Sequence, residues 1–467
     1  KGLMPAPEAV LSAIVEGSLV DIDTADKIET GYFVNLAISP VAKNMISTFF
    51  FQLNKLKTGE NRPDGYPKNT VKKLGVLGAG MMGAGIAYVA AKSGIEVILK
   101  DLTLENAEKG RSYTTKIQDK LINKKRSSHE EKEAIVNRIK ATDNSADLAD
   151  CDLVIEAVFE NTVLKAKVTQ EAEEHLLDST VFASNTSTLP ITQLANASRN
   201  QQQFIGMHFF SPVDRMSLVE IICGEQTNDE TLAKAFDFVL QINKTPIVVN
   251  DSRGFYTSRV FSTFIDEGAE LLIAGVAPAK IENLTKAAGM PVGPLAQQDE
   301  VSQRLSWDIS KSNRKLVEEA NEQWHDSAKD IILRRMVEEF DRQGRAYGAG
   351  FYEYSECGDK SIWPKLNTLY KRVDIPDQDI KDRILFRQSI EAVKCLQENV
   401  LRSVTDGNIG SIFGIGFPMH TGGQFQYINS FGLKPFIKRC IELSENYGDR
   451  FLPPKLLLEM AENEETF

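Results

Sequence analysis

The sequence predicts an α/β chain in which a doubly wound, parallel sheet domain is followed by all-helical domains. Two observations indicate this. Between residues 68 and 252, short apolar runs alternate with helix-length segments, and from about residue 253 the strand patterns stop. Continuous apolar strands separated by helices are typical of a parallel sheet covered on both faces.

Residues 1–67 carry helical spacing with no strand pattern, and the Pro/Gly-rich stretch GENRPDGYPKN at 59–69 has the composition of a linker. We therefore expect a helical connector ahead of the sheet domain. The chain opens with KGLMPAPEAV rather than an initiator Met, which leads us to expect a fragment of a longer polypeptide.

Strands of the sheet domain are expected where four to eight apolar residues follow one another, with helical segments such as 81–94 and 164–177 between several of them. The candidate strands are 72–78, 95–101, 151–158, 180–185, 203–210 and 245–251.

The helical region contains an internal similarity. A helical stretch ends in GMPVGP at 289–294, and a second one ends in GFPMHTGG at 416–423. Similar order at two places indicates duplication. We expect two helical copies, residues 253–364 and 365–467.

Composition restricts the classes of function. The net charge of −11 argues against a general binder of nucleic acid or membrane surfaces, which needs a positive field. The five cysteines form no CxxC pair and no zinc spacing, which favours free thiols in a reducing compartment and no metal site. No apolar stretch approaches the ~18–20 residues of a membrane span.

A dinucleotide site is predicted at LGVLGAGMMGAG, where Gly78, Gly80 and Gly83 form a GxGxxG between a strand and a helix. The glycines allow a tight turn, close approach of a pyrophosphate and close helix packing, as in Rossmann-type domains. The next strand ends in Asp101, at the distance expected for an acid that binds the adenosine ribose. A carboxylate there favours NAD over NADP, although Lys100 beside it weakens that preference.

Two polar residues interrupt apolar runs in FIGMHFFSPVDRMSLVEII, residues 204–222. His208 and Glu220 stand twelve residues apart in stretches that resemble core strands. A buried histidine bonded to the backbone is one interpretation. A histidine aimed at a substrate is the other, and the two residues alone leave both open.

The order of motifs along the chain resembles the 3-hydroxyacyl-CoA dehydrogenase family, and within it the dehydrogenase part of the multifunctional alpha subunits of fatty-acid oxidation complexes. The resemblance covers residues 70 to 430, and residues 1–67 resemble the connector that follows an enoyl-CoA hydratase module, itself missing here. The motifs that carry it are LGVLGAGMMGAGIAY, VIEAVFENTVLKAKV, FASNTSTLPI, GMHFFSPVDRMSLVEII, VVNDSRGFYTSR, GMPVGP and FGIGFPMHTGG.

The resemblance implies NAD-dependent oxidation of an L-3-hydroxyacyl-CoA to a 3-ketoacyl-CoA, with His208 as general base and Glu220 bonded to its far ring nitrogen. A neutral imidazole suits this task because its unperturbed pKa of ~6.5 lies near working pH. The functional interpretation of His208 then becomes the favoured one.

Further contacts are implied position by position. Met82 and Asp101 would contact the adenosine side of NAD, and Val158, Glu160 and Lys165 the nicotinamide-ribose side. Ser187 and Asn185 would lie at the nicotinamide end, with Ser187 also near the substrate oxygen. The alternatives are a solvated lysine on a helix face for Lys165, and capping of a strand end for Ser187 and Asn185.

The sequence departs from the family pattern at three positions. Ser211 and Ser258 stand where many members have Asn, which puts the substrate contacts there in doubt, and Phe413 stands where some relatives have Tyr. The basic residues of LINKKRSSHEEK, 121–132, are expected either to meet CoA phosphates or to form a solvated helix end.

Two other functions are alternatives to the dehydrogenase. One is an assembly subunit, weakly active or inactive, that holds a thiolase partner. The other is a dehydrogenase of short 3-hydroxybutyryl-CoA alone, which the connector-like start disfavours. For the leading function we expect an oligomer with a thiolase beta subunit as partner, located in a bacterial cytoplasm rather than a mitochondrial matrix.

Overall fold

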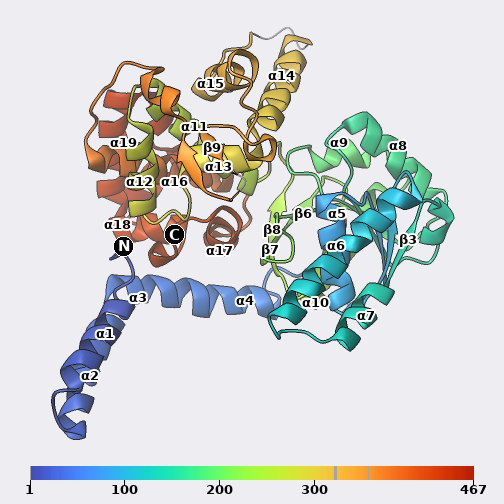
Figure 1. Ribbon diagram of the computed structural model, residues 1–467, viewed down its shortest axis with the longest axis horizontal. Helices are drawn as coiled ribbons and strands as arrows, with labels where there is room; N and C mark the ends of the chain where they lie inside the picture. The colour runs from blue at the N-terminus through green and yellow to red at the C-terminus, as the bar shows by residue number, and fades with distance from the viewer. Residues whose placement is uncertain (1, 320–322, 356) are drawn as a thin grey trace. The chain divides into compact units, whose positions relative to one another are not determined.

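The computed structural model describes residues 2–319, 323–355 and 357–467. The chain divides into two compact units, each of which is built from segments distant in sequence. The sheet unit comprises Ser47–Arg259 and Cys395–Ile415, and the helical unit comprises Lys1–Ile46, Val260–Lys394 and Gly416–Phe467 (Figure 1).

Among the described residues of the sheet unit, eight strands form one sheet in the order β3-β2-β1-β4-β5-β6-β7-β8. All neighbours are parallel except the antiparallel pair β6 and β7. The strands are β1 (Lys73–Leu77), β2 (Glu96–Lys100), β3 (Ile139–Thr142), β4 (Leu153–Glu156), β5 (Val181–Ser184), β6 (Phe204–Phe209), β7 (Leu218–Cys223) and β8 (Thr245–Asn250).

The predicted doubly wound sheet is confirmed by the parallel strands β1 to β6, of which β3 was not among the expected strands. The reversal at β7 is a further feature that the strand patterns did not show. Residues 210–217 connect β6 to β7. A crossover to a parallel neighbour needs a dozen or more residues, so this short connection returns the chain antiparallel to β6. The polar loop SPVDRM thereby places two buried strands side by side in opposite directions.

The two faces of the sheet are covered by different helices. On one face, Met207 and Val219 share an apolar core with Phe236 of α10 (Asp229–Gln241) and with α5 (Met81–Lys92). The opposite face meets α9 (Ile191–Ala195) and α17 (Val404–Ile415): Ile191 lies against Gly206, and Leu218 against Gly414. Strand side chains alternate between faces, so His208 and Glu220 point toward α9 and α17.

Three further helices of the sheet unit begin at side-chain caps, which satisfy backbone N–H groups of the first turn. Thr103 caps α6, Ser128 caps α7 and Asn161 caps α8. The elements not yet named are α4 (Leu53–Thr58), α6 (Leu104–Asn123), α7 (His129–Asn137), α8 (Thr162–Glu173) and the 3-10 helices η2 (Ser145–Leu148) and η3 (Gln201–Gln203); the π-helix η1 (Ile46–Gln52) joins the two units.

Most helices of the helical unit surround a second apolar core that includes Phe264, Leu271, Ile332, Phe351 and Ile384. The α-helices are α1 (Ala6–Gly17), α2 (Ile22–Ala37), α3 (Pro40–Met45), α11 (Thr257–Ile273), α12 (Pro278–Ala287), α13 (Pro294–Val301), α14 (Gln303–Glu319), α15 (Ala328–Arg334), α16 (Asp377–Gln397), α18 (Gln424–Phe431), α19 (Leu433–Tyr447) and α20 (Lys455–Glu462). The π-helix η4 (Arg335–Glu339) and the 3-10 helices η5 (Arg345–Tyr347), η6 (Pro364–Thr368), η7 (Met419–Thr421) and η8 (Asp449–Phe451) complete the unit.

The expectation that strands stop at residue 253 is wrong in one place. Two short strands, β9 (Tyr352–Tyr354) and β10 (Lys360–Ile362), pair antiparallel. Asp299 accepts hydrogen bonds from the backbone N–H groups of Phe351 and Tyr352 at 2.8 and 2.9 Å, which fixes the start of β9. Three-residue strands held by a distant carboxylate leave no periodicity of their own in the sequence.

The first two helices form a hairpin with no buried residue on either helix. The exposed apolar side chains of the hairpin include Leu11 and Ile14 of α1, Leu19 of the turn, and Ile22 and Phe33 of α2. No described helix is both long and apolar enough to cross a membrane.

Candidate active site

The site begins with the pairing of two strands. In the antiparallel register of β6 and β7, His208 stands directly opposite Glu220. Directly opposed residues of an antiparallel pair have Cβ atoms about 4.5–5.5 Å apart and point to the same face. The spacing of twelve residues seen in the sequence is therefore the spacing that this hairpin register requires.

The two side chains form a buried pair. Nδ1 of His208 lies 3.0 Å from Oε2 of Glu220, and the two residues are 8% and 0% exposed. A carboxylate accepts only, so Nδ1 carries the proton and Nε2 is left with its lone pair. Among the described residues, Nδ1 is the ring nitrogen that is hydrogen-bonded, which leaves Nε2 as the basic atom.

Glu220 is held in place by the start of α11. Its Oε1 accepts from the backbone N–H groups of Tyr256 and Thr257 at 3.0 and 3.1 Å. Its Oε2 accepts a short hydrogen bond from the Thr257 hydroxyl as well as the bond from His208. The positive end of a helix dipole also favours a carboxylate at this position. These four donors explain how a fully buried acid remains in one orientation.

A turn of unusual backbone aims those N–H groups at Glu220. Gly254 and Phe255 have φ of 77° and 51°, so both adopt the left-handed conformation immediately before α11. A bulky residue with positive φ is strained and is found where surrounding structure fixes it. Phe255 is fully buried, and its ring lies 6.3 Å from that of His208, while Phe210 lies at 4.5 Å. The imidazole therefore packs against two aromatic rings.

The glycine loop has the shape that a dinucleotide needs. Gly78 has φ of 96°, and a Cβ on Gly83 would lie 1.8 Å from the carbonyl oxygen of Gly78, so neither position accepts another residue without a shift. A Cβ on Gly80 would meet nothing within 4 Å. Gly80 therefore borders open space at the N-terminus of α5, where a phosphate would approach the backbone N–H groups. These residues fit NAD.

Asp101 stands beside this loop at the end of β2. Its Oδ2 accepts from the backbone N–H of Ala79 at 2.7 Å, and Oδ1 accepts from Leu102 at 2.8 Å. Oδ1 also accepts from the side-chain amide of Asn106 at 3.3 Å, so Oδ2 is the oxygen that retains a lone pair for a ribose hydroxyl. Lys100, which weakened the preference for NAD, is directed elsewhere, because its Nζ forms an ion pair with Glu171 at 3.1 Å.

Lys165 lies in a second buried cluster at the ends of β4 and β5. Its Nζ donates to Oε1 and Oε2 of Glu156 at 2.8 and 3.0 Å and lies 3.3 Å from Glu160. Lys165 is 2% exposed, which excludes the alternative of a solvated lysine. Glu156 also accepts from the Ser184 hydroxyl at 2.7 Å.

Glu160 connects this cluster to the loop after β5. Its Oε1 accepts from the Thr186 hydroxyl at 2.5 Å and from the Ser187 backbone N–H at 2.8 Å. Burial alone would raise the pKa of Glu160, but the Lys165 ammonium, the Thr186 hydroxyl and the Ser187 N–H together hold this pKa below its ordinary value. The carboxylate stays ionised and fixes the loop.

The other predicted residues surround the same ends of the strands. Asn185 accepts from the backbone N–H of Phe209 at 2.8 Å and so joins the ends of β5 and β6. The Ser258 hydroxyl donates to the Ser187 carbonyl at 2.9 Å. Met82 is partly buried and packs on the apolar core of the sheet. The Val158 backbone N–H donates to Glu156 at 2.7 Å. Ser211 is exposed, and its hydroxyl lies 3.8 Å from the Met81 sulfur.

The structure thus resolves part of what the sequence left open. Asn185 does link a strand end, as the capping alternative proposed, and this leaves its amide nitrogen for other contacts. Lys124, Lys125 and Arg126 are all exposed at the end of α6. Phe413 packs edge-on against Phe49 at 5.9 Å. Sequence reasoning missed Glu156, Ser184 and Thr257, although VIEAV, FASN and GFYTSR contained the signal of polar residues at element ends.

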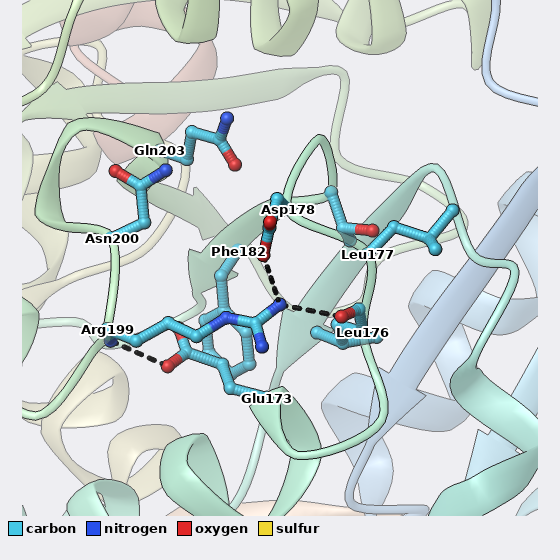
Figure 2. Close-up of a pocket in the computed structure, with 9 residues that line it drawn as sticks. Glu173, Leu176, Leu177, Asp178, Phe182, Arg199, Asn200 and Gln203 are labelled. Atoms are coloured by element: carbon cyan, nitrogen blue, oxygen red, sulfur yellow. Dashed lines mark hydrogen bonds and ion pairs between the residues drawn. The ribbon is translucent and has the colours of Figure 1, made fainter.

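A separate pocket lies at the amino ends of β5 and β6, the opposite edge of the sheet from Asn185 and His208, and is lined by Glu173, Leu176, Asp178 and Arg199 among others. Figure 2 shows the Arg199 guanidinium turned between two acceptors. It lies 2.6 Å from the Leu176 carbonyl and 3.2 Å from Asp178, so its charge is already paired. Within the described residues, no group of three His, Cys, Asp or Glu side chains is arranged for a metal ion.

Comparison with known proteins agrees with this geometry. Residues 73–252 match the model of the 3-hydroxyacyl-CoA dehydrogenase NAD binding domain, and residues 254–354 match that of the C-terminal domain of the same family. A solved (S)-3-hydroxybutyryl-CoA dehydrogenase from Ralstonia eutropha is 34% identical, with a TM-score of 0.56 over 62% of this chain and 100% of its own. The chain belongs to the 3-hydroxyacyl-CoA dehydrogenase family.

This family placement confirms the fold class, the NAD-dependent dehydrogenase class and the cofactor NAD expected from the sequence. Relatives named fatty acid oxidation complex subunit alpha, from Idiomarina loihiensis and Shewanella frigidimarina, are 35% and 36% identical over 99% and 100% of this chain. The chain spans 65% of the length of each. A 3-hydroxybutyryl-CoA dehydrogenase from Escherichia coli, 22% identical, shares the fold with a TM-score of 0.73 over 85% of this chain and 99% of its own.

Proposed function

We propose that this chain oxidises L-3-hydroxyacyl-CoA to 3-ketoacyl-CoA, with His208 as general base and Glu220 as its orienting partner. The observation that carries the proposal is the buried His208–Glu220 pair, which presents a neutral Nε2. It is supported by family membership and by relatives whose names contain fatty acid oxidation. A location in the bacterial cytoplasm is part of this proposal, because the relatives are bacterial proteins.

Oxidation removes a proton from the C3 hydroxyl and a hydride from C3. NAD, when bound, accepts the hydride. Nε2 of His208 takes the proton, and the hydroxyl oxygen becomes the ketone oxygen, so charge and atoms balance. The imidazolium that forms lies against the Glu220 carboxylate at Nδ1, which favours the charged ring.

The proposed binding residues divide into two sets. Gly78, Gly80, Gly83, Met82 and Asp101 would hold the adenosine and pyrophosphate side of NAD. The nicotinamide side and the substrate would meet Val158, Glu160, Lys165, Asn185, Ser187, Ser211 and Ser258. Ser258 bonds the Ser187 carbonyl, which supports a role in shaping this loop.

The test is NADH-linked reduction of acetoacetyl-CoA by the purified chain. His208→Ala is expected to lower kcat about 10²–10⁴-fold, the usual contribution of a general acid or base. His175→Ala is the matched control, because His175 is an exposed histidine of the same unit. Absence of turnover by the unaltered chain, or equal rates for the chain and His208→Ala, would refute the proposal.

We also propose that the chain works within a complex that contains a thiolase beta subunit. The names of its relatives, which describe a complex subunit, support this. Co-purification of a thiolase with the tagged chain from the cytoplasmic fraction of a bacterial host is the expected result. A chain that binds thiolase but has no turnover would instead be an assembly subunit.

A further inference from the structure

The hydrogen-bonded pair of the site has a third member. Thr257 Oγ1 donates to Oε2 of Glu220, the oxygen that also accepts from His208. The same hydroxyl oxygen lies 3.5 Å from Nδ1 of His208, and Thr257 is fully buried. A threonine hydroxyl has one proton to donate, and this proton is given to Glu220.

We propose that Thr257 is a positioning residue that sets how strong a base His208 is, by sharing the Glu220 oxygen that orients the imidazole. The inference deepens the proposed function and rests on it, because it assigns a controlling group to the proposed base. Thr257 acts through Glu220 and is not assigned a contact with substrate or cofactor.

The physical reason is competition for one carboxylate. An adjacent carboxylate stabilises the imidazolium and so raises the basicity of a histidine. The Thr257 hydroxyl proton places positive potential between Glu220 and Nδ1 of His208. It also occupies a lone pair of Oε2, so that Oε2 binds the imidazolium less strongly than it would with His208 as its one donor. Both effects favour the neutral imidazole, which is the form that accepts the substrate proton.

Other donors to Glu220 do not duplicate this role. The backbone N–H groups of Tyr256 and Thr257 bind Oε1, away from the oxygen bonded to His208. They also belong to the backbone and persist in any substitution at 257. The hydroxyl is therefore the one side-chain donor, among the described residues, that reaches Oε2 besides His208 itself.

Titratable groups also face the pair from neighbouring elements. The buried Tyr256 hydroxyl, whose pKa is raised by burial far above 10, donates to the Gly407 carbonyl. Asp406 of α17 and Cys395 of α16 interact electrostatically with Tyr256. Burial raises the pKa of Asp406 to about 7, but its hydrogen bonds are to Ser403, Val248 and Asn61. Asp406 is present in every variant at position 257, so its titration affects the His208 pKa equally in each and cancels when the variants are compared.

The variant Thr257→Val tests the proposal because valine has the same shape without the hydroxyl. Thr257→Ser is the matched control, since it keeps the donor. The readout is NMR titration of the His208 imidazole in each full chain, with the signal assigned by its loss in His208→Gln. The pKa of His208 is expected to rise by about half to one unit in Thr257→Val and to stay near the unaltered value in Thr257→Ser.

The acid limb of the pH profile of kcat/KM should move upward by the same amount in Thr257→Val. If that variant unfolds, Thr257→Ala also lacks the hydroxyl and should give the same shift. An unchanged or lowered His208 pKa without the hydroxyl would overturn the inference. The NMR titration needs no turnover. An inactive chain would therefore refute the proposed function, while the effect of Thr257 on the His208 pKa could still be measured.

Discussion

Lys165 shows how burial decides between two interpretations of one residue. In the sequence it is one of two lysines in LKAKVTQEAEEHLL, where a solvated position is the ordinary expectation. In the structure it is almost fully buried, and two carboxylates surround its ammonium. The contact to a ribose remains a prediction, but the role in fixing Glu156 and Glu160 is visible.

Replacing Lys165 with methionine should destabilise the chain strongly. The change leaves Glu156, 1% exposed, with a buried charge and no cation, which costs about 3–5 kcal/mol of unfolding free energy. Lys167→Met, two residues along the same helix and exposed, should change this free energy by less than about 0.5 kcal/mol. Urea denaturation measures both, and equal effects would contradict the account.

The sequence predicted the His208–Glu220 pair but not Thr257. Two polar residues in apolar strands at hairpin spacing are visible without a structure. The approach of Thr257 depends on the left-handed turn at Gly254 and Phe255, and positive φ at a phenylalanine is not signalled by residue type. Ser258 was predicted as a substrate contact by resemblance alone, and its bond to the Ser187 carbonyl was not foreseeable.

The connection between β6 and β7 is the element on which the site depends. It joins the strand of His208 to the strand of Glu220, and a register slip of one residue would move a strand's side chains to the other face. Lys244, buried before β8, donates to the carbonyls of Val213 and Met216 at 2.6 and 2.5 Å. These bonds fix the fold of the connection and so the register of the pair.

This anchor should make stability depend on pH. Burial lowers the pKa of Lys244 to about 8, with a smaller opposing effect of Asp214. In the unfolded chain the lysine titrates near ~10.4, so between these values the unfolded state binds more protons and the native state gains stability as pH rises. Below pH 8 both states are protonated and the buried charge costs stability.

The measurement is the unfolding free energy of the unaltered chain minus that of Lys244→Met, from pH 7 to pH 10. The difference should rise by about 1–3 kcal/mol above pH 8, because the variant lacks the Lys244 ammonium. The contributions of the other titratable groups are the same in both chains and cancel. A difference that stays flat, or falls with pH, would show that the ammonium keeps an ordinary pKa.

At the scale of the whole molecule, the strand patterns predicted the sheet, whereas the chain's division into units was not visible in them. Residues 395–415 belong to the sheet unit although they lie far beyond it in sequence. A buried helix that returns to a sheet has the same apolar periodicity as one that stays in its own bundle. Composition along the chain therefore gives no sign of this return.

The domain boundaries 1–67, 68–252, 253–364 and 365–467, with duplication of the last two, remain our proposal. One packing contact supports the duplication. The turn of GMPVGP lies against that of GFPMHTGG: a Cβ on Gly289 would meet Pro418 at 2.8 Å, and one on Gly416 would meet Pro291 at 2.9 Å. Related turns that pack on one another are expected when two copies pair about an approximate two-fold axis.

The role of His208 as the general base is tested most directly by a crystal structure of the chain with NAD and acetoacetyl-CoA bound. We expect Nε2 of His208 to lie within hydrogen-bond reach of the substrate C3 oxygen, about 2.6–3.2 Å, with Nδ1 still bonded to Glu220. A bound substrate whose C3 oxygen lies well beyond that reach, with another side chain in the place of Nε2, would contradict it.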